Sequence, residues 1–181
     1  MKHGKLVRIV VPVLIVMAIG AIWIIKNPQR EELANPVSAN QTAVAVPHDD
    51  FLLHATLIDL EVLKTHHLPI MIDFGADWCV PCRELAPVLV KMNAEMQGKA
   101  IIKYVDTQKY ADIASGFPVQ VIPIQVLVSS DGKPYVPSRD LGIAFTMYAY
   151  SDTGEHAFTV HQGGLTEEQM RILLVDMGAM L

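Results

Sequence analysis

The sequence predicts an α/β fold in which strands and helices alternate and pack in layers. Pro69 to Phe74 is an apolar run, interrupted only by Asp73, which is typical of a strand inside a sheet. Residues 79–97 follow, with apolar side chains at helical spacing: Leu85, Val88, Leu89, Met92 and Met96. Two strand-like segments on either side of the turn residues 151–154 then predict a hairpin.

The other elements are expected from the same patterns. Residues 51–55 indicate a short strand, and residues 58–66 indicate a helix with Leu60 and Leu63 on one face. Pro87 predicts a kink in the long helix, and Gly98 predicts its end. The later elements are a strand over 100–105, a short helix over 110–115, a strand over 124–129, hairpin arms over 145–150 and 155–162, and a final helix started by a Thr166–Gln169 capping box.

Cys79 and Cys82 are the only two cysteines of the chain, and they lie at the start of the expected long helix. A pair at this spacing after a buried strand is arranged for reversible thiol–disulfide exchange. The N-terminus of a helix carries partial positive charge and free N–H groups, which favour a thiolate over a thiol. Cys79 is therefore the expected nucleophile, and Cys82 would resolve the mixed disulfide.

Three other interpretations of the cysteine pair fit the sequence less well. A structural zinc site usually needs four Cys or His ligands, and no second cysteine pair completes one. Covalent haem attachment needs a histidine directly after the second cysteine, where Arg83 stands. A purely structural disulfide would close too short a loop to constrain the unfolded chain. We therefore expect neither a metal nor a cofactor.

Asp73 is the one charged residue in its apolar run. We expect its carboxylate to accept the proton that Cys82 must lose, through a water molecule. Burial would raise the pKa of Asp73 toward the working range. The alternative is a residue at the end of the strand that faces solvent.

Residues 1–26 have the pattern of a signal anchor. Ile9 to Ile25 carries no charge, spans roughly 25 Å as a helix and is flanked by basic residues on both sides. A cleaved signal peptide is the alternative, but no cleavage site is well placed after the apolar run. The basic residues ahead of the span predict a single-pass protein of the cell membrane. Its N-terminus would be cytoplasmic and the remainder extracytoplasmic, where disulfides persist.

Residues 27–47 are rich in Pro, Asn, Ala and Ser and are expected to form a flexible linker, although a short amphipathic helix is the competing interpretation. Residues 48–181 form the expected folded domain. All nineteen acidic residues of the chain follow residue 26, whereas four of the fourteen basic residues lie within residues 1–26. The acidic character of the domain argues against nucleic acid as a partner.

The segment from Asp73 to Arg83, with the sequence DFGADWCVPCR, resembles the active-site segment of the thioredoxin superfamily. Gly75 stands where thioredoxins commonly have tryptophan. Four further matches follow in the family's order: Pro87 in the long helix, Lys103 to Asp106, Val121 to Pro123, and Gly163 to Leu165. The resemblance covers residues 51–180 and implies a three-layer sandwich, in which helices flank a central mixed sheet.

The resemblance also implies roles for residues near the cysteines. The lysine of the family's third strand, here Lys103, would lie close to the buried Asp73 and moderate its pKa. Pro123 would be cis and would leave the backbone of Ile122 free to pair with an extended substrate. The residues expected to contact the substrate are Trp78, Val80, Pro81 and Ile122.

One departure from the family pattern is an insertion of about twenty residues at 134–155, where thioredoxins have a tight turn. It is expected to add a strand, such as 143–150, before the last strand of the sheet. We expect the insertion to change the surface that binds partners and to leave the thiol–disulfide chemistry unchanged.

The resemblance implies a monomeric thiol–disulfide oxidoreductase that acts on protein disulfides. We expect it to act as a reductant, because the active-site segment looks like that of thioredoxin and Ile122 precedes the proline. Outside the cytoplasm it would need electrons, which implies a polytopic membrane thiol-electron transporter of the cytochrome c biogenesis type as partner. The alternatives are a disulfide-forming oxidase or isomerase, and a non-catalytic adaptor that docks a membrane complex through 134–155.

Overall fold

The computed structural model describes residues 49–180. The chain divides into two units after Val44, and all of the described residues belong to the second. The predicted anchor at 1–26 and the predicted linker at 27–47 lie outside the described residues. Within residues 49–180, no helix combines the length and the apolar character needed to cross a membrane.

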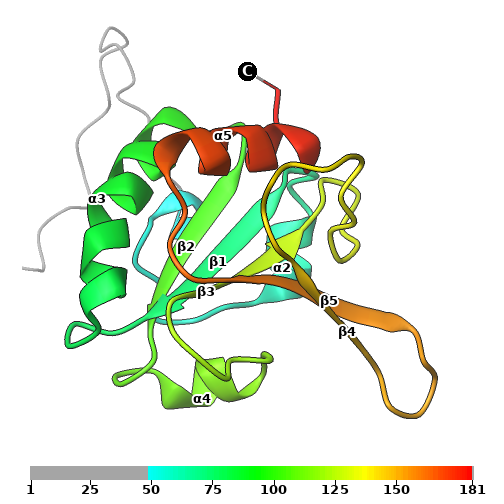
Figure 1. Cartoon of the computed structure of the whole chain (residues 1–181), viewed down its shortest axis with the longest axis horizontal. Coiled ribbons are helices and arrows are strands. Elements are labelled where there is room, and N and C mark those ends of the chain that lie inside the picture. The colour runs from blue at the N-terminus through cyan, green and yellow to red at the C-terminus, as the bar shows by residue number, and fades with distance from the viewer. Residues whose placement is uncertain (1–48, 181) are drawn as a thin grey trace, which may run out of the picture. The chain divides into compact units, whose positions relative to one another are not determined.

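The centre of the fold is a mixed five-stranded sheet with the strand order β2-β1-β3-β5-β4 (Figure 1). Strand β1 (Ile70–Gly75) pairs in parallel with β2 (Ile101–Asp106) and antiparallel with β3 (Ile124–Val128). Strand β5 (His156–Gln162) pairs antiparallel with both β3 and the edge strand β4 (Thr146–Ala149). The predicted hairpin is thus present, and β4 is the extra strand expected before the last one.

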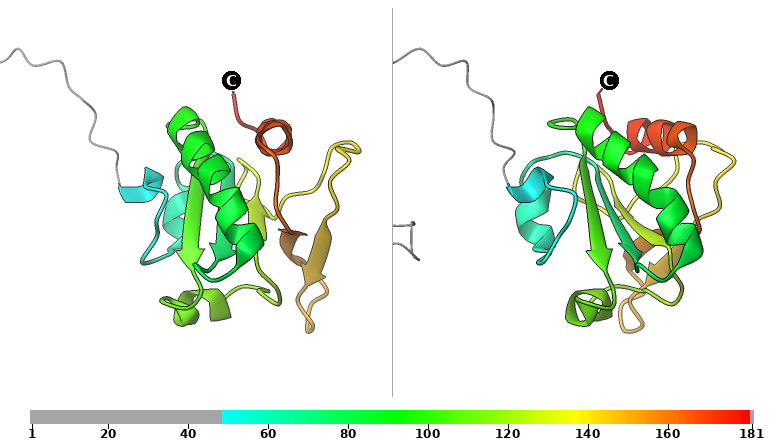
Figure 2. Two further views of the ribbon diagram at one scale, coloured as in Figure 1. Left: turned by 60° about the vertical axis from the view of Figure 1, so that its left-hand side comes forward. Right: turned by 90° about the vertical axis from the view of Figure 1, so that its left-hand side faces the viewer.

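Helices cover both faces of this sheet (Figure 2). Helices α3 (Val80–Glu95) and α5 (Glu167–Asp176) contribute apolar side chains to one core cluster, which they share with Met71 and Ile102 of the sheet. The short helices α2 (Leu60–Lys64) and α4 (Ala111–Ser115) pack against the opposite cluster, which contains Ile72. The result is the predicted three-layer arrangement of helices around a mixed sheet.

Local sequence accounts for the strand and helix that carry the cysteines. All six residues of β1 are buried, as a continuous apolar run predicts. Helix α3 begins after Cys79, whose side chain accepts the backbone N–H of Cys82, and Pro81 lies in the first turn, where proline is tolerated. The helix continues through Pro87.

The N-terminal part of the domain differs from the prediction. Instead of a strand over 51–55, the chain forms a 3₁₀ turn, η1 (Asp49–Phe51), and then a single bridge between His54 and Tyr104. Two backbone hydrogen bonds hold this edge: the N–H of Tyr104 donates to the carbonyl of Leu53, and the N–H of Ala55 donates to the carbonyl of Tyr104. The expected helix over 58–66 is reduced to α2 because Asp59 caps its start.

The insertion at 134–155 is part of the fold rather than a free loop. Tyr135 is fully buried and Ile143 is nearly so, and both belong to the core cluster beneath α3 and α5. The Tyr135 hydroxyl donates to Asp176 Oδ2 at 2.6 Å, and the Tyr135 carbonyl accepts the hydroxyl of Thr159 at 2.5 Å. The insertion therefore ties the end of α5 to β5 before it forms the edge strand.

Candidate active site

Cys79 and Cys82 form a disulfide at the N-terminus of α3. Both side chains are only 4% exposed. Strand β1 delivers the chain to this point, and the loop 76–79 turns it into the helix, so that Cys79 stands at the cap and Cys82 one turn inside. This is the placement that activates the first cysteine of the pair for attack.

The segment before β3 lies beside the disulfide. The Ile122–Pro123 peptide bond is cis, as the resemblance implies. The carbonyl oxygen of Ile122 lies 3.8 Å from Cys79 Sγ. Pro123 is buried, whereas Ile122 is half-buried. An extended peptide that reaches Cys79 would therefore pass next to the Ile122 backbone.

An open groove of about 680 Å³ runs past Cys79. Trp78 is 65% exposed at its rim, and Val80 and Val121 also present large apolar surfaces. All four residues predicted to contact the substrate line this groove, together with Cys79: Trp78, Val80, Pro81 and Ile122. Exposed apolar side chains around a reactive sulfur suit the binding of a polypeptide segment.

Asp73 is buried beneath the helix layer with 1% of its surface exposed. Burial raises the pKa of Asp73 to about 7, and a hydrogen bond from Gln125 opposes part of this rise. The amide Nε2 of Gln125 donates to Asp73 Oδ1 at 2.6 Å. Among residues 49–180, Asp73 Oδ2 has no hydrogen-bond partner. The carboxyl group can therefore exchange a proton near neutral pH.

Asp73 and Cys82 share one layer of the fold. A Cβ atom placed on Gly75 would lie 3.3 Å from Cys82 Cβ and 3.4 Å from Cys82 Sγ. Because alternate residues of a strand point to the same face, Asp73 lies on the face of β1 that Cys82 covers. Asp73 and Cys82 therefore lie on the same side of the sheet.

Comparisons with known proteins agree with this geometry. The family model described as Thioredoxin matches residues 54–140. Thioredoxin 1 of Chlorobaculum tepidum is 42% identical over 72 residues, which are 40% of this chain and 69% of that protein. Thioredoxin C-2 of Corynebacterium nephridii is 33% identical over 57% of this chain and 87% of its own length. The chain belongs to the thioredoxin family.

As a thioredoxin-family protein, it is a thiol–disulfide oxidoreductase. The thioredoxin of Borreliella burgdorferi is 40% identical over 38% of this chain and 58% of its own length. A solved structure of chloroplastic thioredoxin z covers 70% of this chain and 93% of its own, with 20% identity and a TM-score of 0.49.

The expected proximity of Lys103 to Asp73 is wrong. In the parallel pairing of β1 with β2, Lys103 lies opposite Ile72 and Tyr104 lies opposite Asp73. Paired residues share a face, so Lys103 points to the other side of the sheet. There its Nζ donates to the carbonyl of Leu52 at 2.9 Å. The lysine is one residue out of register with the role that the resemblance implied for it.

Gln125, rather than a lysine, is the partner that the structure brings to Asp73, and the sequence analysis missed it. A signal for it was present, because Gln125 interrupts the apolar run of β3 as Asp73 interrupts that of β1. In the antiparallel pairing of these strands Asp73 lies directly opposite Gln125. Polar side chains in adjacent buried strands tend to hydrogen-bond to one another, and here one bond joins the two.

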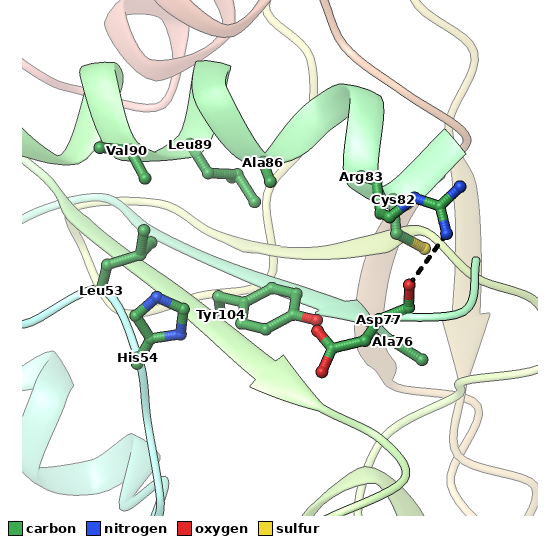
Figure 3. A pocket seen from close by; sticks show the side chains of 10 residues that line it. All are labelled: Leu53, His54, Ala76, Asp77, Cys82, Arg83, Ala86, Leu89, Val90 and Tyr104. Carbon is green, nitrogen blue, oxygen red and sulfur yellow. Dashed lines mark hydrogen bonds between the residues drawn. The ribbon is translucent and has the colours of Figure 1, made fainter. Parts of the chain in front are cut away.

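Gly75, where thioredoxins commonly have tryptophan, makes room for Tyr104. A Cβ on Gly75 would lie only 2.9 Å from Tyr104 Cε2. A small cavity of about 120 Å³ opens beside this contact (Figure 3), with Cys82 on its α3 wall and Tyr104 and Asp77 on its sheet side. Burial and the nearby carboxylates of Asp106 and Asp77 raise the pKa of Tyr104 to about 12, so its hydroxyl stays protonated at neutral pH.

No cluster that could hold a metal ion occurs among residues 49–180, whose acidic, histidine and cysteine side chains do not gather in groups of three. The cysteine pair is oxidised, and its sulfur atoms are bonded to each other.

Proposed function

We propose that this protein reduces disulfide bonds in other proteins, with Cys79 as the nucleophile and Cys82 as the resolving cysteine. The observation that carries the proposal is the position of the pair: Cys79 stands at the N-terminus of α3 and lines an apolar groove beside Ile122. A polypeptide bound in that groove would bring its own disulfide to the one sulfur that the helix end activates.

The reaction proceeds through two exchanges. The Cys79 thiolate attacks one sulfur of the substrate disulfide, and the other substrate sulfur leaves as a thiolate. Cys82 then loses its proton to Asp73 and attacks Cys79 Sγ, which breaks the mixed disulfide and releases the second substrate thiolate. The two released thiolates take up protons from solvent and from Asp73. The substrate has gained two electrons, and the protein has lost them in forming the Cys79–Cys82 disulfide.

The proposal includes a place in the cell. The charge-free run at 9–25 with flanking basic residues supports a membrane anchor with the oxidoreductase domain outside the cytoplasm. A reductant in that compartment consumes electrons that glutathione and thioredoxin do not supply there. A polytopic membrane thiol-electron transporter of the cytochrome c biogenesis type would then reduce Cys79–Cys82.

The reduction potential of the cysteine pair tests the direction of electron flow. It can be read from tryptophan fluorescence in dithiothreitol or glutathione buffers, because Trp78 precedes Cys79. A value near that of thioredoxin, about −270 mV, supports the reductant. A value near −120 mV, typical of strong periplasmic oxidants, would make the protein a disulfide donor instead.

Two measurements in cells test the location and the electron source. Cell fractionation with a thiol-alkylating reagent that does not cross membranes should place the protein in the membrane fraction, with the cysteine pair accessible from outside. Deletion of the transporter should leave the pair oxidised. A pair that stays fully reduced after the deletion would contradict the transporter proposal. A Cys79→Ser variant that keeps the protein's phenotype would favour the non-catalytic adaptor.

A further inference from the structure

Gln125 and Asp73 form a buried polar pair between two strands of the sheet. Gln125 has no exposed surface, and Asp73 has 1%. The Gln125 Nε2 atom donates to two acceptors, Asp73 Oδ1 at 2.6 Å and the carbonyl of Gly163 at 3.1 Å. Burial of both partners makes this contact costly to break, because both groups are shielded from bulk solvent.

The Gly163 acceptor connects this pair to the Pro123 segment. The N–H of Gly163 donates to the carbonyl of Pro123 at 2.9 Å. Gly163 itself has a positive φ of 109°, a conformation that favours glycine. The Gln125 amide is thus held from one side by the turn after β5, and its orientation is fixed when it reaches Asp73.

The two oxygens of the Asp73 carboxyl group have different surroundings. Oδ1 accepts the short bond from Gln125, whereas Oδ2 is buried without a hydrogen-bond partner among residues 49–180. One lone pair of Oδ1 is already engaged by the Gln125 amide, whereas the unpaired buried Oδ2 gains most from a proton. The geometry therefore distinguishes the oxygen that can take up a proton.

We propose that Gln125 is a positioning residue for the exchange reaction, which holds Asp73 by Oδ1 so that Oδ2 accepts the proton of Cys82. This inference rests on the proposed role of Asp73 as the proton acceptor. In the resolving step, the Cys82 S–H bond breaks and an O–H bond forms at Oδ2 through a bridging water. The electron pair left on Cys82 Sγ forms the bond to Cys79 Sγ. The bond between Cys79 and the substrate breaks, and the substrate leaves as a thiolate. The hydrogen bond from Gln125 also favours the charged carboxylate, which must be present to accept a proton.

Other titratable groups on this face need separate controls. Tyr104 of β2 lies opposite Asp73, and His161 of β5 lies opposite Gln125. Cys82 of α3 lies against Gly75 on this face, and the side chains that α5 contributes to the core here are Met170, Leu173 and Leu174. A Tyr104→Phe variant and a His161→Gln variant should each leave the apparent pKa of the resolving step in place.

The test uses the full chain with Gln125→Leu, which keeps the side-chain size and removes the donor. The measured quantity is the pH dependence of the resolving step, followed as release of a preformed mixed disulfide on Cys79. We expect the apparent pKa of this step to rise by about one pH unit, and the rate at neutral pH to fall by up to about tenfold. Gln162→Leu, which alters an exposed glutamine at the end of β5, should match the wild type.

An Asp73→Asn background separates positioning from a structural role. There Gln125→Leu should change neither the rate nor the pH profile, because Gln125 acts through Asp73. If Gln125→Leu slows the resolving step equally in the wild type and in Asp73→Asn, the proposal is overturned. It is also overturned if Gln125→Leu leaves the pH profile unchanged while Asp73→Asn changes it. An unchanged profile for Asp73→Asn alone would instead overturn the role of Asp73 in the proposed function, and the Gln125 proposal with it.

A measurement on the wild-type chain covers the case in which Gln125→Leu fails to fold. In a pH titration by NMR, the Gln125 side-chain amide resonances should move with the same midpoint as the Asp73 carboxyl carbon. Amide resonances that do not respond while Asp73 titrates would overturn the proposal.

Discussion

At the scale of single residues, the site depends on keeping a carboxyl group in a layer that water barely reaches. Asp73 is almost fully buried, and one amide donor only partly offsets the cost of its charge. A strand that only had to fill the core would carry an apolar residue here. The buried carboxyl group therefore has a cost in stability, and the proton-accepting role proposed for Asp73 would explain why the chain keeps it.

Asp73→Asn should reveal that cost. The pKa of Asp73 is about 7 in the folded protein against 3.8 as the ordinary value, so the folded state binds more protons than the unfolded state between these pH values. The contribution of Asp73 to the free energy of unfolding is therefore most favourable below about pH 4. It falls as the pH rises to about 7, by on the order of 4 kcal/mol at most. In urea unfolding of the oxidised proteins, the free energy of unfolding of Asp73→Asn should increase relative to that of the wild type as the pH rises from 4 to 8. A difference independent of pH would contradict the assignment.

Gly75→Ala should destabilise the protein by about 1–3 kcal/mol, because the new Cβ would overlap the Tyr104 ring, 2.9 Å away, and crowd Cys82. Denaturant unfolding measures the loss. Tyr104→Leu in the same chain should recover part of it by vacating the space. If Gly75→Ala is as stable as the wild type, the Tyr104 ring does not limit the space beside Gly75.

At the scale of elements, prediction from sequence succeeded where a pattern was long and regular. The apolar run at 69–74 and the helical spacing over 79–97 placed β1 and α3 to within about two residues, because burial alone determines such segments. The segment 51–55 failed, since an edge segment can be held by two hydrogen bonds without becoming a strand.

Face assignment is the second point at which the sequence interpretation failed. A shift of one residue moves a strand side chain to the other side of the sheet, and this is the error made for Lys103. The pairing of Asp73 with Gln125 depends on the register of two strands about fifty residues apart, which one sequence does not specify. The cysteines needed no such information, because their spacing alone carries the chemistry.

Helix α5 offers a direct test of a predicted local signal. Thr166 Oγ1 accepts the N–H of Gln169 at 3.2 Å, and the Thr166 N–H donates to Gln169 Oε1 at 2.9 Å. Thr166→Ala should cost about 1 kcal/mol in the free energy of unfolding, measured with urea. Thr166→Ser keeps the hydroxyl and should cost much less. Equal losses for the two variants would assign the effect to something other than the cap.

At the scale of the whole molecule, the insertion at 134–155 joins parts of the fold that are far apart in sequence. Its first residues place Tyr135 in the core and against Asp176 at the end of α5, and its later residues add β4 to the open edge of the sheet. The sequence predicted the extra strand but not this anchoring, because the contact between Tyr135 and Asp176 spans 41 residues.

Tyr135→Phe should therefore destabilise the whole domain, by about 1–3 kcal/mol, because it removes the hydrogen bond to the Asp176 carboxylate within a partly buried site. Thermal or urea unfolding should show one cooperative transition shifted as a unit. Tyr150→Phe, at an exposed position in the hairpin, is the matched control and should leave stability unchanged. A separate early transition for Tyr135→Phe would mean that the insertion unfolds independently.

The central claim is that Cys79 attacks and Cys82 resolves, and trapping of mixed disulfides tests it most directly. A Cys82→Ser chain incubated with disulfide-bonded substrate proteins should accumulate covalent complexes on nonreducing gels, because nothing can release them. A Cys79→Ser chain should accumulate none, because Cys82 stands one turn inside the helix and does not line the groove that Cys79 lines. Complexes that form through Cys82 in the Cys79→Ser chain, and not through Cys79 in the Cys82→Ser chain, would contradict the account.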